Sequence, residues 1–478
     1  FMKKFKFTIS NFNKYLIFCI SILFIYLFYL SIPTIYNKDL LQKELSKKIL
    51  SNYNLNISLS SDIDYLILPS PHFLIKNAKI YNNSSTIPEE LGQIKNLKVF
   101  ISKKSLMKQK HMRITKLLIK DANFSIRKDK LSFYNNYINK KLSENRIEIK
   151  NSNFFFKDES DETISILFVP SLYLFFDNEK NINKLSGNGE IFQVPISFKW
   201  KKEFNEYNPK NFLLDIEPLS LNFENKSKDF ENQGGKGENI INLGNVKLIT
   251  SYLFKENSIL LESENSKVFN SFIKYDGKIN IKPFFIDLNI DLEKINLNKI
   301  FTKNPIIKEI LFSKIIFDEN LSAKINIKSN NIKNKLFEKI NFNLNVDGGS
   351  INLNESILFN EKIGKLNLKN SSFLFENDEL IFNGYFNFKI INQNEFYRTF
   401  VVPKRNRKLL ENIDFNIQYN LLKNQLKIID IIINDKTTNN IDNIEEILKT
   451  YNTQEILQIT NWIDLKNFVN KIFDNYFG

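Results

Sequence analysis

The sequence predicts a mainly β protein: an elongated, curled antiparallel sheet or β-groove of repeating strand units, with one N-terminal transmembrane helix and a C-terminal amphipathic helical segment. Three observations predict this fold. An uncharged apolar run lies close to the N-terminus, apolar and polar residues alternate over many segments after Leu55, and a ten-residue strand pattern recurs along the chain.

The apolar run from Tyr15 to Ile32 contains about 18 residues and no charge, which is enough to cross the hydrocarbon core of a bilayer. Lysines precede the run and almost no net charge follows it, so the positive-inside rule places residues 1–14 in the cytoplasm and the remaining chain outside. A cleaved signal peptide is the alternative, but it has a shorter apolar core and a small-residue cleavage site. The run therefore favours an uncleaved anchor at 15–33.

Residues 34–54 follow the anchor with helical spacing. Among Lys, Glu and Gln residues, the apolar residues fall at helical spacing: Leu40, Leu41, Leu45, Ile49 and Leu50. This spacing predicts a short amphipathic helix that ends near Tyr53.

From Leu55 onward the period of the pattern changes to two, which indicates strands with one apolar and one polar face. The clearest alternation covers four segments, Leu97 to Ile101, Phe284 to Leu292, Ile340 to Val346 and Ile413 to Tyr419.

Helical signals are scarce in the same part of the chain. The candidates are Tyr134 to Asn145 and Leu297 to Phe312, and both are short. An apolar sheet face must be buried against something, and these helices are too few to cover so many strands. Either two sheets face each other, or a curled sheet keeps an open apolar furrow.

Four segments share a Lys-Asn or Lys-Asp pair between two short alternating halves. They are FLIKNAKIYN from Phe73, LLIKDANFSI from Leu117, IEIKNSNFFF from Ile147 and LNLKNSSFLF from Leu366. Asn or Asp can bend the chain locally, so the pattern predicts a strand with a kink or tight corner. Its recurrence suggests a solenoid-like sheet grown by addition, although a composition rich in Ile, Asn, Lys and Phe could generate such segments by chance.

Residues 441–478 close the chain as one or two predicted amphipathic helices. They either pack onto the end of the sheet or dock a partner or a second membrane surface.

The composition restricts the classes of partner. The net charge is +14, but the 67 Lys and Arg residues are dispersed, whereas nucleic-acid binding needs a concentrated basic face with stacking aromatics. We therefore expect no nucleic-acid partner and interpret the charge as weak attraction to anionic lipid. The single cysteine, Cys19, lies in the apolar run, so no disulfide framework can form.

No catalytic or metal-binding pattern occurs. His72 and His111 are the only histidines and lack ligand spacing. The GGKG segment at 234–237 lacks the first Gly and the Ser or Thr of a phosphate loop, so it predicts a turn. The acidic cluster at 158–162 predicts a solvated hairpin tip rather than a calcium site. We expect no enzyme, no cofactor and no metal.

Several of these motifs resemble the AsmA family. The N-terminal part, residues 14 to about 158, has an anchor, a short helix, then LILPSPHFLIKNAKIYN with Pro69 and Pro71, followed by LKVFISKKSLM and RITKLLIKDANFSI. The stretch from Asn341 to Asp435 looks like the family's C-terminal region more loosely. The turn after the first helix departs from the family, since Asn52-Tyr53-Asn54 stands in place of the usual Thr-Gly.

The resemblance implies a single-pass protein of the bacterial inner membrane whose β-structure lies in the periplasm and conducts phospholipids. It implies no catalytic residues. The domains expected are a cytoplasmic N-terminus at 1–14, the anchor at 15–33, the helix at 34–54, an N-terminal AsmA-like β region at 55–200, a middle β region at 201–340, a C-terminal AsmA-like β region at 341–440, and helices at 441–478.

The function expected is phospholipid transport or outer-membrane maintenance through an apolar groove. Membrane phospholipids are the expected partners, together with envelope proteins at the C-terminal helix. The groove candidates are Phe284, Ile286, Leu288, Ile290, Leu292, Ile340, Phe342, Leu344, Val346, Ile413, Phe415 and Ile417. The headgroup candidates, otherwise a solvated loop, are Arg398, Lys404, Arg405, Arg407 and Lys408. The alternative function is an anchored structural or assembly factor for outer-membrane proteins, with a closed, dry sheet.

Overall fold

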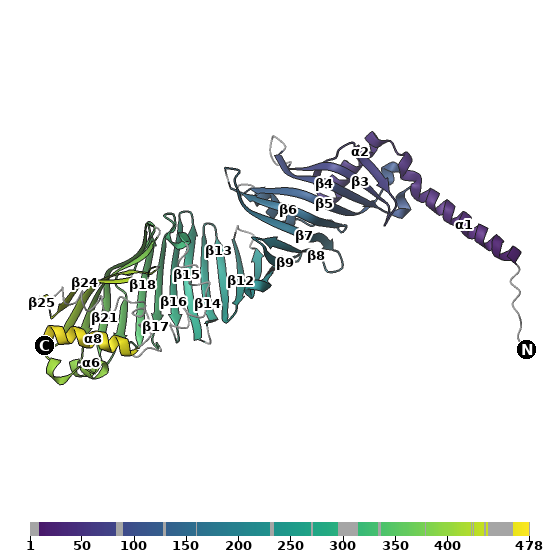
Figure 1. The fold of residues 1–478 in the computed structure, drawn as a ribbon. Helices are drawn as coiled ribbons and strands as arrows, with labels where there is room; N and C mark the ends of the chain where they lie inside the picture. Colours follow the sequence, from purple (N-terminus) through teal and green to yellow (C-terminus); the bar gives the residue numbers. More distant parts are fainter. Residues whose placement is uncertain are drawn as a thin grey trace, which may run out of the picture. The chain divides into compact units, whose positions relative to one another are not determined.

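The computed structural model describes residues 9–82, 89–127, 131–158, 160–229, 234–268, 271–294, 314–332, 336–377, 379–421, 423, 425–434, 436–437 and 462–477. The chain is mainly β, with one antiparallel-dominated sheet, an apolar helix at its N-terminal side and a helix at its C-terminal side (Figure 1). The predicted fold class is confirmed. The chain divides into two compact units: unit 1 contains residues 1–229 and 241–244, and unit 2 contains residues 230–240 and 245–478.

Unit 1 begins with helical elements and continues with a long run of strands. Its helices are α1 Ile9–Ser31, η1 Ile32–Ile35, α2 Lys38–Tyr53, η2 Lys103–Ser105, η3 Gln109–His111, α3 Leu131–Asn139 and η5 Glu217–Leu219. Its strands are β1 Asn56–Ser58, β2 Ile63–Leu66, β3 His72–Asn82, β4 Glu89–Ile101, β5 Ile114–Arg127, β6 Arg146–Lys157, β7 Thr163–Asp177, β8 Ile182–Ile191, β9 Val194–Glu203, β10 Lys210–Ile216 and β11 Leu221–Asp229.

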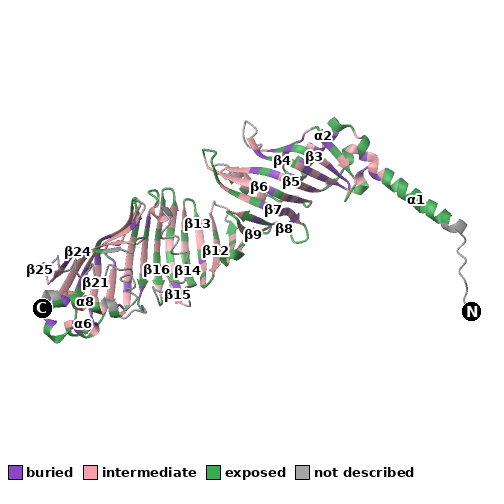
Figure 2. Ribbon diagram, viewed as in Figure 1, coloured by how far each residue is buried: buried purple, intermediate pink, exposed green. Residues whose placement is uncertain are grey.

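Helix α1 carries the predicted anchor. The stretch Asn13–Ile35 has a mean hydropathy of 2.4 and is only 6% buried, so it is long and apolar enough to cross a membrane. Most of its described residues are exposed, as the green colour of α1 in Figure 2 shows.

The strands of unit 1 pair in chain order from β3 to β11, while β1 and β2 both pair with β3. Every one of these pairs is antiparallel except β5–β6, which is parallel. Helix α3 lies in the connection between β5 and β6, because parallel neighbours need a crossover.

Helix α2 covers one face of this sheet, as its spacing predicts. Asn37 caps its first turn by accepting a hydrogen bond from the backbone N–H of Leu40 at 3.0 Å. Leu41, Leu45 and Ile49 are buried in the main core of unit 1. Burying one apolar stripe of this kind contributes more to helix stability than residue propensity does.

The predicted kinks are confirmed in all four repeat segments. Asn77, Asp121, Asn151 and Asn370 have φ values of 55°, 57°, 47° and 44°, in the left-handed region that Asn and Asp tolerate better than other side chains. At each such residue the in–out alternation of the strand shifts by one, and β3–β7 shift together, so their register is kept. For this reason Ile75 and Ala78, three positions apart, are both fully buried on the same face.

Unit 2 contains the remaining elements, except that residues 241–243 at the end of β12 belong to unit 1. Its strands are β12 Gly234–Leu243, β13 Val246–Lys255, β14 Ser258–Val268, β15 Ser271–Ile281, β16 Phe284–Leu292, β17 Ala323–Ser329, β18 Lys339–Asp347, β19 Ser350–Asn352, β20 Ile357–Asn360, β21 Gly364–Glu376, β22 Glu379–Ile390, β23 Asn412–Asn420, β24 Gln425–Ile433 and β25 Lys436–Thr437. Its helices are η6 Lys314–Phe317, α6 Gln393–Phe400, η7 Lys404–Asn406 and α8 Trp462–Phe477.

From β13 to β25 each strand pairs with its neighbour along the chain, and short β19 and β20 share the place between β18 and β21. Only β16–β17 is parallel among these pairs of described strands. The main core of unit 2 lies where α6 and α8 pack beside β21–β24 (Figure 1), with Phe396, Phe400 and Phe473 at its centre.

One prediction of local structure is confirmed in part and another is wrong. The helix predicted at Tyr134–Asn145 is present as α3, but it begins at Leu131 and ends at Asn139, where side chains from β8 and β9 bind the carbonyls of its C-terminal end. The GGKG segment at 234–237 belongs to strand β12 rather than a turn, and the tight turn follows at Gly244, whose φ is 55°.

Two helix predictions concern residues only partly described. The prediction at Leu297–Phe312 lies outside the described residues. The C-terminal helical prediction is confirmed at α8, while 441–461 lies outside the described residues.

Candidate functional site

The strand register of unit 2 places apolar side chains in rows that cross many strands on one face. Directly paired residues share a face of the sheet. One row is Tyr252, Leu261, Gly277, Leu288, Ile325 and Leu344. A second is Phe254, Ile259, Ile279, Ile286, Ala323, Val346, Ile351, Phe373, Phe382 and Tyr419. A third is Ile273, Leu292, Ser329, Ile340, Leu358, Leu366, Phe388, Ile413 and Ile433.

We call this surface the apolar face of unit 2. All twelve groove candidates from the sequence lie on it. Each candidate either belongs to one of these rows or lies two positions from a row member along β16, β18 or β23, and residues two apart on a strand share a face. The structure therefore brings together three segments that are far apart in the sequence.

The twelve residues differ in burial. Ile340 and Val346 are buried, with 4% and 7% of their surface exposed, whereas Phe284 is 45% exposed. The other nine are half-buried. On strand β16 the alternation is regular, since Ile286, Leu288 and Ile290 are half-buried while their polar neighbours are exposed.

Packing on the apolar face is concentrated at particular places. Residues of η6 and the turn after it, Ile316, Phe317 and Leu321, pack over Ala323 and Val346. Helices α6 and α8 cover the rows on β21–β24. Between them, Leu288, Ile290 and Ile327 join no apolar cluster formed by the described residues. Figure 2 shows this intermediate burial as pink along β12–β18.

The opposite face of unit 2 is polar. Asn289 donates from Nδ2 to Asp276 Oδ2 at 3.1 Å, and Asn326 donates to Asn289 Oδ1 at 2.9 Å, so amide side chains form a ladder across three strands. Two shallow depressions of about 590 and 600 Å³ occur beside β13–β15, where charged and amide side chains line them together with apolar residues such as Leu253 and Leu260. The contrast makes the sheet of unit 2 amphipathic across its thickness.

Unit 1 also has an apolar row that crosses many strands, and the burial of its residues decreases from β3 toward β10. One row contains Phe73, Val99, Leu117, Ile147, Leu174, Leu185, Trp200 and Phe212. The first five are buried beneath α2 and α3, but Leu185, Trp200 and Phe212 are half-buried. The core beneath the helices thins out beyond β7: Leu185 and Phe198 still pack against it as half-buried side chains, whereas Trp200 and Phe212 join no apolar cluster of the described residues.

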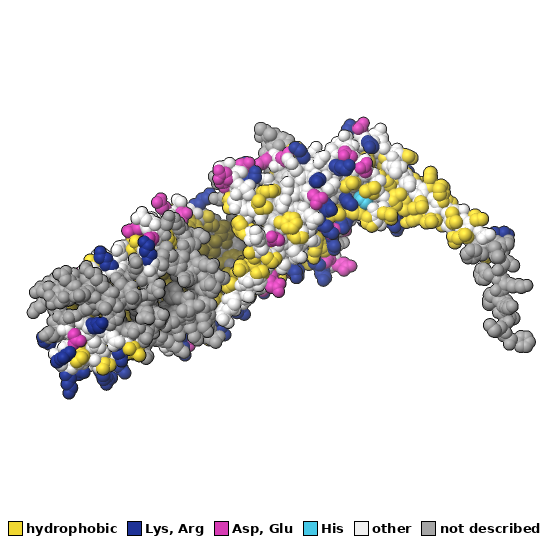
Figure 3. Space-filling model, in the orientation of Figure 1, with side chains coloured by type: hydrophobic (Ala, Val, Ile, Leu, Met, Phe, Trp, Pro, Cys, Tyr) yellow, Lys and Arg dark blue, Asp and Glu magenta, His cyan; other side chains and the backbone are white. Residues whose placement is uncertain are grey.

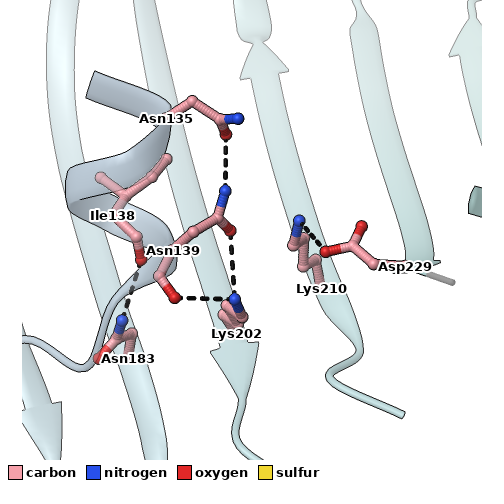
Figure 4. A network of polar contacts seen from close by, with 7 residues as sticks. All are labelled: Asn135, Ile138, Asn139, Asn183, Lys202, Lys210 and Asp229. Atoms are coloured by element: carbon pink, nitrogen blue, oxygen red, sulfur yellow. Dashed lines mark hydrogen bonds and ion pairs between the residues drawn. The ribbon is translucent and has the colours of Figure 1, made fainter. Parts of the chain in front are cut away.

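A polar network marks one end of the open rows in unit 1 (Figure 4). The Lys202 ammonium donates to Asn139 O at 2.8 Å and to Asn139 Oδ1 at 3.3 Å, at the C-terminal end of α3. Asn183 donates to Ile138 O at 3.0 Å and to Lys140 O at 2.7 Å. A helix C-terminus carries partial negative charge and unsatisfied carbonyls, which these donors neutralise.

The position of Lys202 is unusual for a lysine, since only 7% of its surface is exposed. Burial, followed by repulsion from the nearby ammonium of Lys210, lowers the pKa of Lys202 below its ordinary value. Lys210 in turn pairs with Asp229, with Nζ and Oδ2 2.6 Å apart. Sequence reasoning missed this network, because β9 reads as an ordinary alternating strand and nothing local brings α3 beside it.

The headgroup candidates lie next to the helices that close unit 2. Arg398 pairs with Glu395 at 2.6 Å on α6, and Arg405 pairs with Asp474 of α8 at 3.4 Å. The Arg407 Nε donates to Val402 O at 2.8 Å. The structure brings these basic residues together, but several are engaged within the protein. The apolar segment before them forms α6 and is buried through Phe396, Tyr397 and Phe400.

The acidic cluster at 158–162 lies between β6 and β7, where Asp158 accepts a hydrogen bond from Glu162 N at 2.9 Å. Among the described residues no group of three His, Cys, Asp or Glu side chains is arranged to hold a metal ion. No protein-family model matches the chain, and no curated protein matches it. The fold and surface thus define a class: a β-sheet protein with an apolar helix and a half-exposed apolar face.

Proposed function

We propose that this protein is anchored by α1 in a bacterial inner membrane and carries phospholipids, or maintains the outer membrane, with its apolar faces as the path for acyl chains. The observation that carries the proposal is the half-buried apolar row across β13–β18 that contains Leu288. The resemblance to the AsmA family supports the same function and the periplasmic location.

The physical argument rests on the cost of exposed apolar surface. Apolar area in contact with water costs about 25 cal/mol per Å², and soluble proteins seldom expose contiguous apolar patches beyond a few hundred Å² without a binding role. Acyl chains are flexible, apolar and long, so they fit rows that run across many strands. The polar ladder on the opposite face keeps that side in water.

The alternative, a closed and dry assembly factor, requires a packed interior. Buried clusters occur at Ala323 and Val346 and beside α6 and α8, but Leu288, Ile290 and Ile327 pack into none of the clusters of described residues. This difference favours the lipid path.

The experiment replaces Leu288 by Asp in the full-length protein and measures co-purified phospholipid by native mass spectrometry. On an open face the carboxylate reaches water, so the variant should stay folded and lose bound lipid. Two control variants show what the same charge does on the polar face and in a buried cluster. Asn289→Asp adds the same carboxyl group one position away on the polar face and should retain lipid. Ile340→Asp places the charge in a buried cluster and should unfold the region at a cost of several kcal/mol.

Two outcomes contradict the proposal. A folded Leu288→Asp variant that carries as much phospholipid as Asn289→Asp would exclude this face as the lipid path. A Leu288→Asp variant that melts as early as Ile340→Asp would show that Leu288 belongs to a closed core.

A further inference from the structure

A loop of unit 1 gathers basic residues beside the end of α1. Residues 102–113 read SKKSLMKQKHMR and contain five Lys and Arg residues and no acidic residue. Those five residues, Lys103, Lys104, Lys108, Lys110 and Arg113, are all exposed. The loop connects β4 to β5 and contains η2 and η3.

This loop is held in a defined position against α1. The hydroxyl of Tyr29 donates to Lys103 O at 2.7 Å, and the Lys103 ammonium donates to the hydroxyl of Tyr26 at 3.3 Å. The hydroxyl of Tyr36 donates to Leu106 O. Because Tyr26 and Tyr29 lie in the last two turns of α1, these bonds place η2 level with the end of the apolar helix.

Buried side chains and further hydrogen bonds also fix the loop to unit 1. Leu106 and Met112 are 0% and 2% exposed, so they act as apolar anchors in the core of unit 1. Gln109 donates to Asn37 O at 2.8 Å, and Ser102 N donates to Arg113 O at 2.9 Å. The basic side chains are therefore displayed from a structured surface.

Large apolar side chains are exposed near the basic loop and the end of α1. Ile35 is 83% exposed, Leu66 41%, Leu68 81% and Met107 65%. The hydroxyl of Tyr65 donates to Leu30 O at 2.6 Å, which holds β2, and thus Leu66, beside the end of α1. In Figure 3 hydrophobic side chains continue from α1 onto the adjoining part of unit 1.

We infer that Ile35, Leu66, Leu68, Met107 and the basic loop 102–113, together called the collar, rest on the bilayer that α1 crosses and bind its anionic phospholipid headgroups. Three properties of the collar match this partner. Exposed apolar side chains insert at the level of the headgroups, tyrosines are common at membrane–water interfaces, and lysines beside a transmembrane helix bind anionic lipids. The inference rests on α1 lying in a bilayer and does not depend on lipid transport.

Binding of this kind would hold unit 1 at a set angle to the membrane. The start of β3, the end of β4 and the start of β5 adjoin the loop, so these strand ends would face the bilayer. The turn between β8 and β9 lies at the opposite ends of the strands, since Ile191 belongs to the row that contains Ile80 and Phe124.

The test uses the full-length protein in nanodiscs, with Cys19→Ser removing the single cysteine. A polarity-sensitive dye is attached at Met107→Cys, or at Phe192→Cys as the control, because Phe192 is 75% exposed in the turn between β8 and β9. Lipids with a nitroxide near the headgroup serve as quenchers. The dye at position 107 should be quenched at least several-fold more strongly than the dye at position 192. Equal quenching at the two positions would overturn membrane contact by the collar.

The second arm tests the headgroup chemistry. Quenching at position 107 is compared between phosphatidylcholine discs and discs that contain phosphatidylglycerol. It should be stronger in the anionic discs, and Lys104→Gln, Lys108→Gln and Lys110→Gln together should remove this difference. The matched control replaces Lys180, Lys199 and Lys201 by Gln, which removes the same charge from exposed positions elsewhere in unit 1. This control should preserve the difference in quenching between the two kinds of disc. A difference that survives the collar substitutions, or vanishes equally in the control, would overturn specific headgroup binding.

Discussion

At the scale of single residues, the left-handed positions decide which side chains face the core. In the segment from Ile147, Asn151 has a φ of 47° and is exposed, while the next residue, Ser152, is fully buried. The Ser152 hydroxyl donates to Lys150 O at 2.8 Å and accepts a hydrogen bond from Ala122 N at 3.1 Å. Ser152 thus satisfies backbone groups of two neighbouring strands where the kink interrupts the regular ladder.

The conformation of Asn151 gives a prediction that does not involve core packing. Asn151→Val places a β-branched residue at positive φ and should lower the free energy of unfolding by about 1–2 kcal/mol. Asn151→Gly tolerates the same φ and should stay within about 0.5 kcal/mol of the parent protein. Thermal unfolding followed by circular dichroism measures both. Equal destabilisation by Val and Gly would show that the side chain, not the backbone conformation, determines stability here.

At the scale of elements, short helices cover limited parts of a wide sheet. Helix α8 contributes Phe473, which is 1% exposed and packs against Phe396 and Tyr397 of α6, with ring centroids 5.9 and 6.3 Å apart. Asn406 donates to Asp474, which adds a polar contact between η7 and α8. Helix α8 therefore holds α6 and η7 together at the end of unit 2.

Removing the aromatic ring at position 473 tests this role of α8. Phe473→Ala should weaken the packing of α8 by about 3–5 kcal/mol, because it leaves a cavity among aromatic rings. Hydrogen exchange measured by mass spectrometry should become faster in α6 and α8 and stay unchanged in α2. Asn467→Ala, an exposed position on the same helix, is the control. If both variants exchange at the rate of the parent protein, Phe473 does not hold these helices.

At the scale of the whole molecule, α1 is the single described helix that is long and apolar enough to span a membrane. Lysines before the apolar run favour an orientation with residues 1–14 in the cytoplasm. Tyr26, Tyr29 and Tyr36, whose hydroxyls bind the basic loop of the collar, lie at or just beyond the other end of α1, where an interfacial aromatic belt is expected.

A reporter fusion tests this orientation. A phosphatase that is active only outside the cytoplasm, fused after Ser46, should be active, and the full-length protein should remain in the membrane fraction after carbonate washing. Fusion after Lys14, before the apolar run, is the control and should be inactive. A soluble, shortened product would instead identify α1 as a cleaved signal peptide.

The sequence by itself determined the local features of this protein. Alternation predicted strands such as β16 and β18, four-residue spacing predicted α2, and Lys-Asn pairs predicted kinks, because each depends on conformational preferences within a few residues. Only the tertiary structure decided how deeply each apolar residue is buried. Leu174 is buried and its partner Leu185 half-buried, although both occupy the same alternating pattern, since Leu174 belongs to the core of unit 1 and Leu185 lies at the margin of that core. Lys202 beside α3 and the basic loop beside α1 likewise depend on contacts between distant segments, which no local pattern encodes.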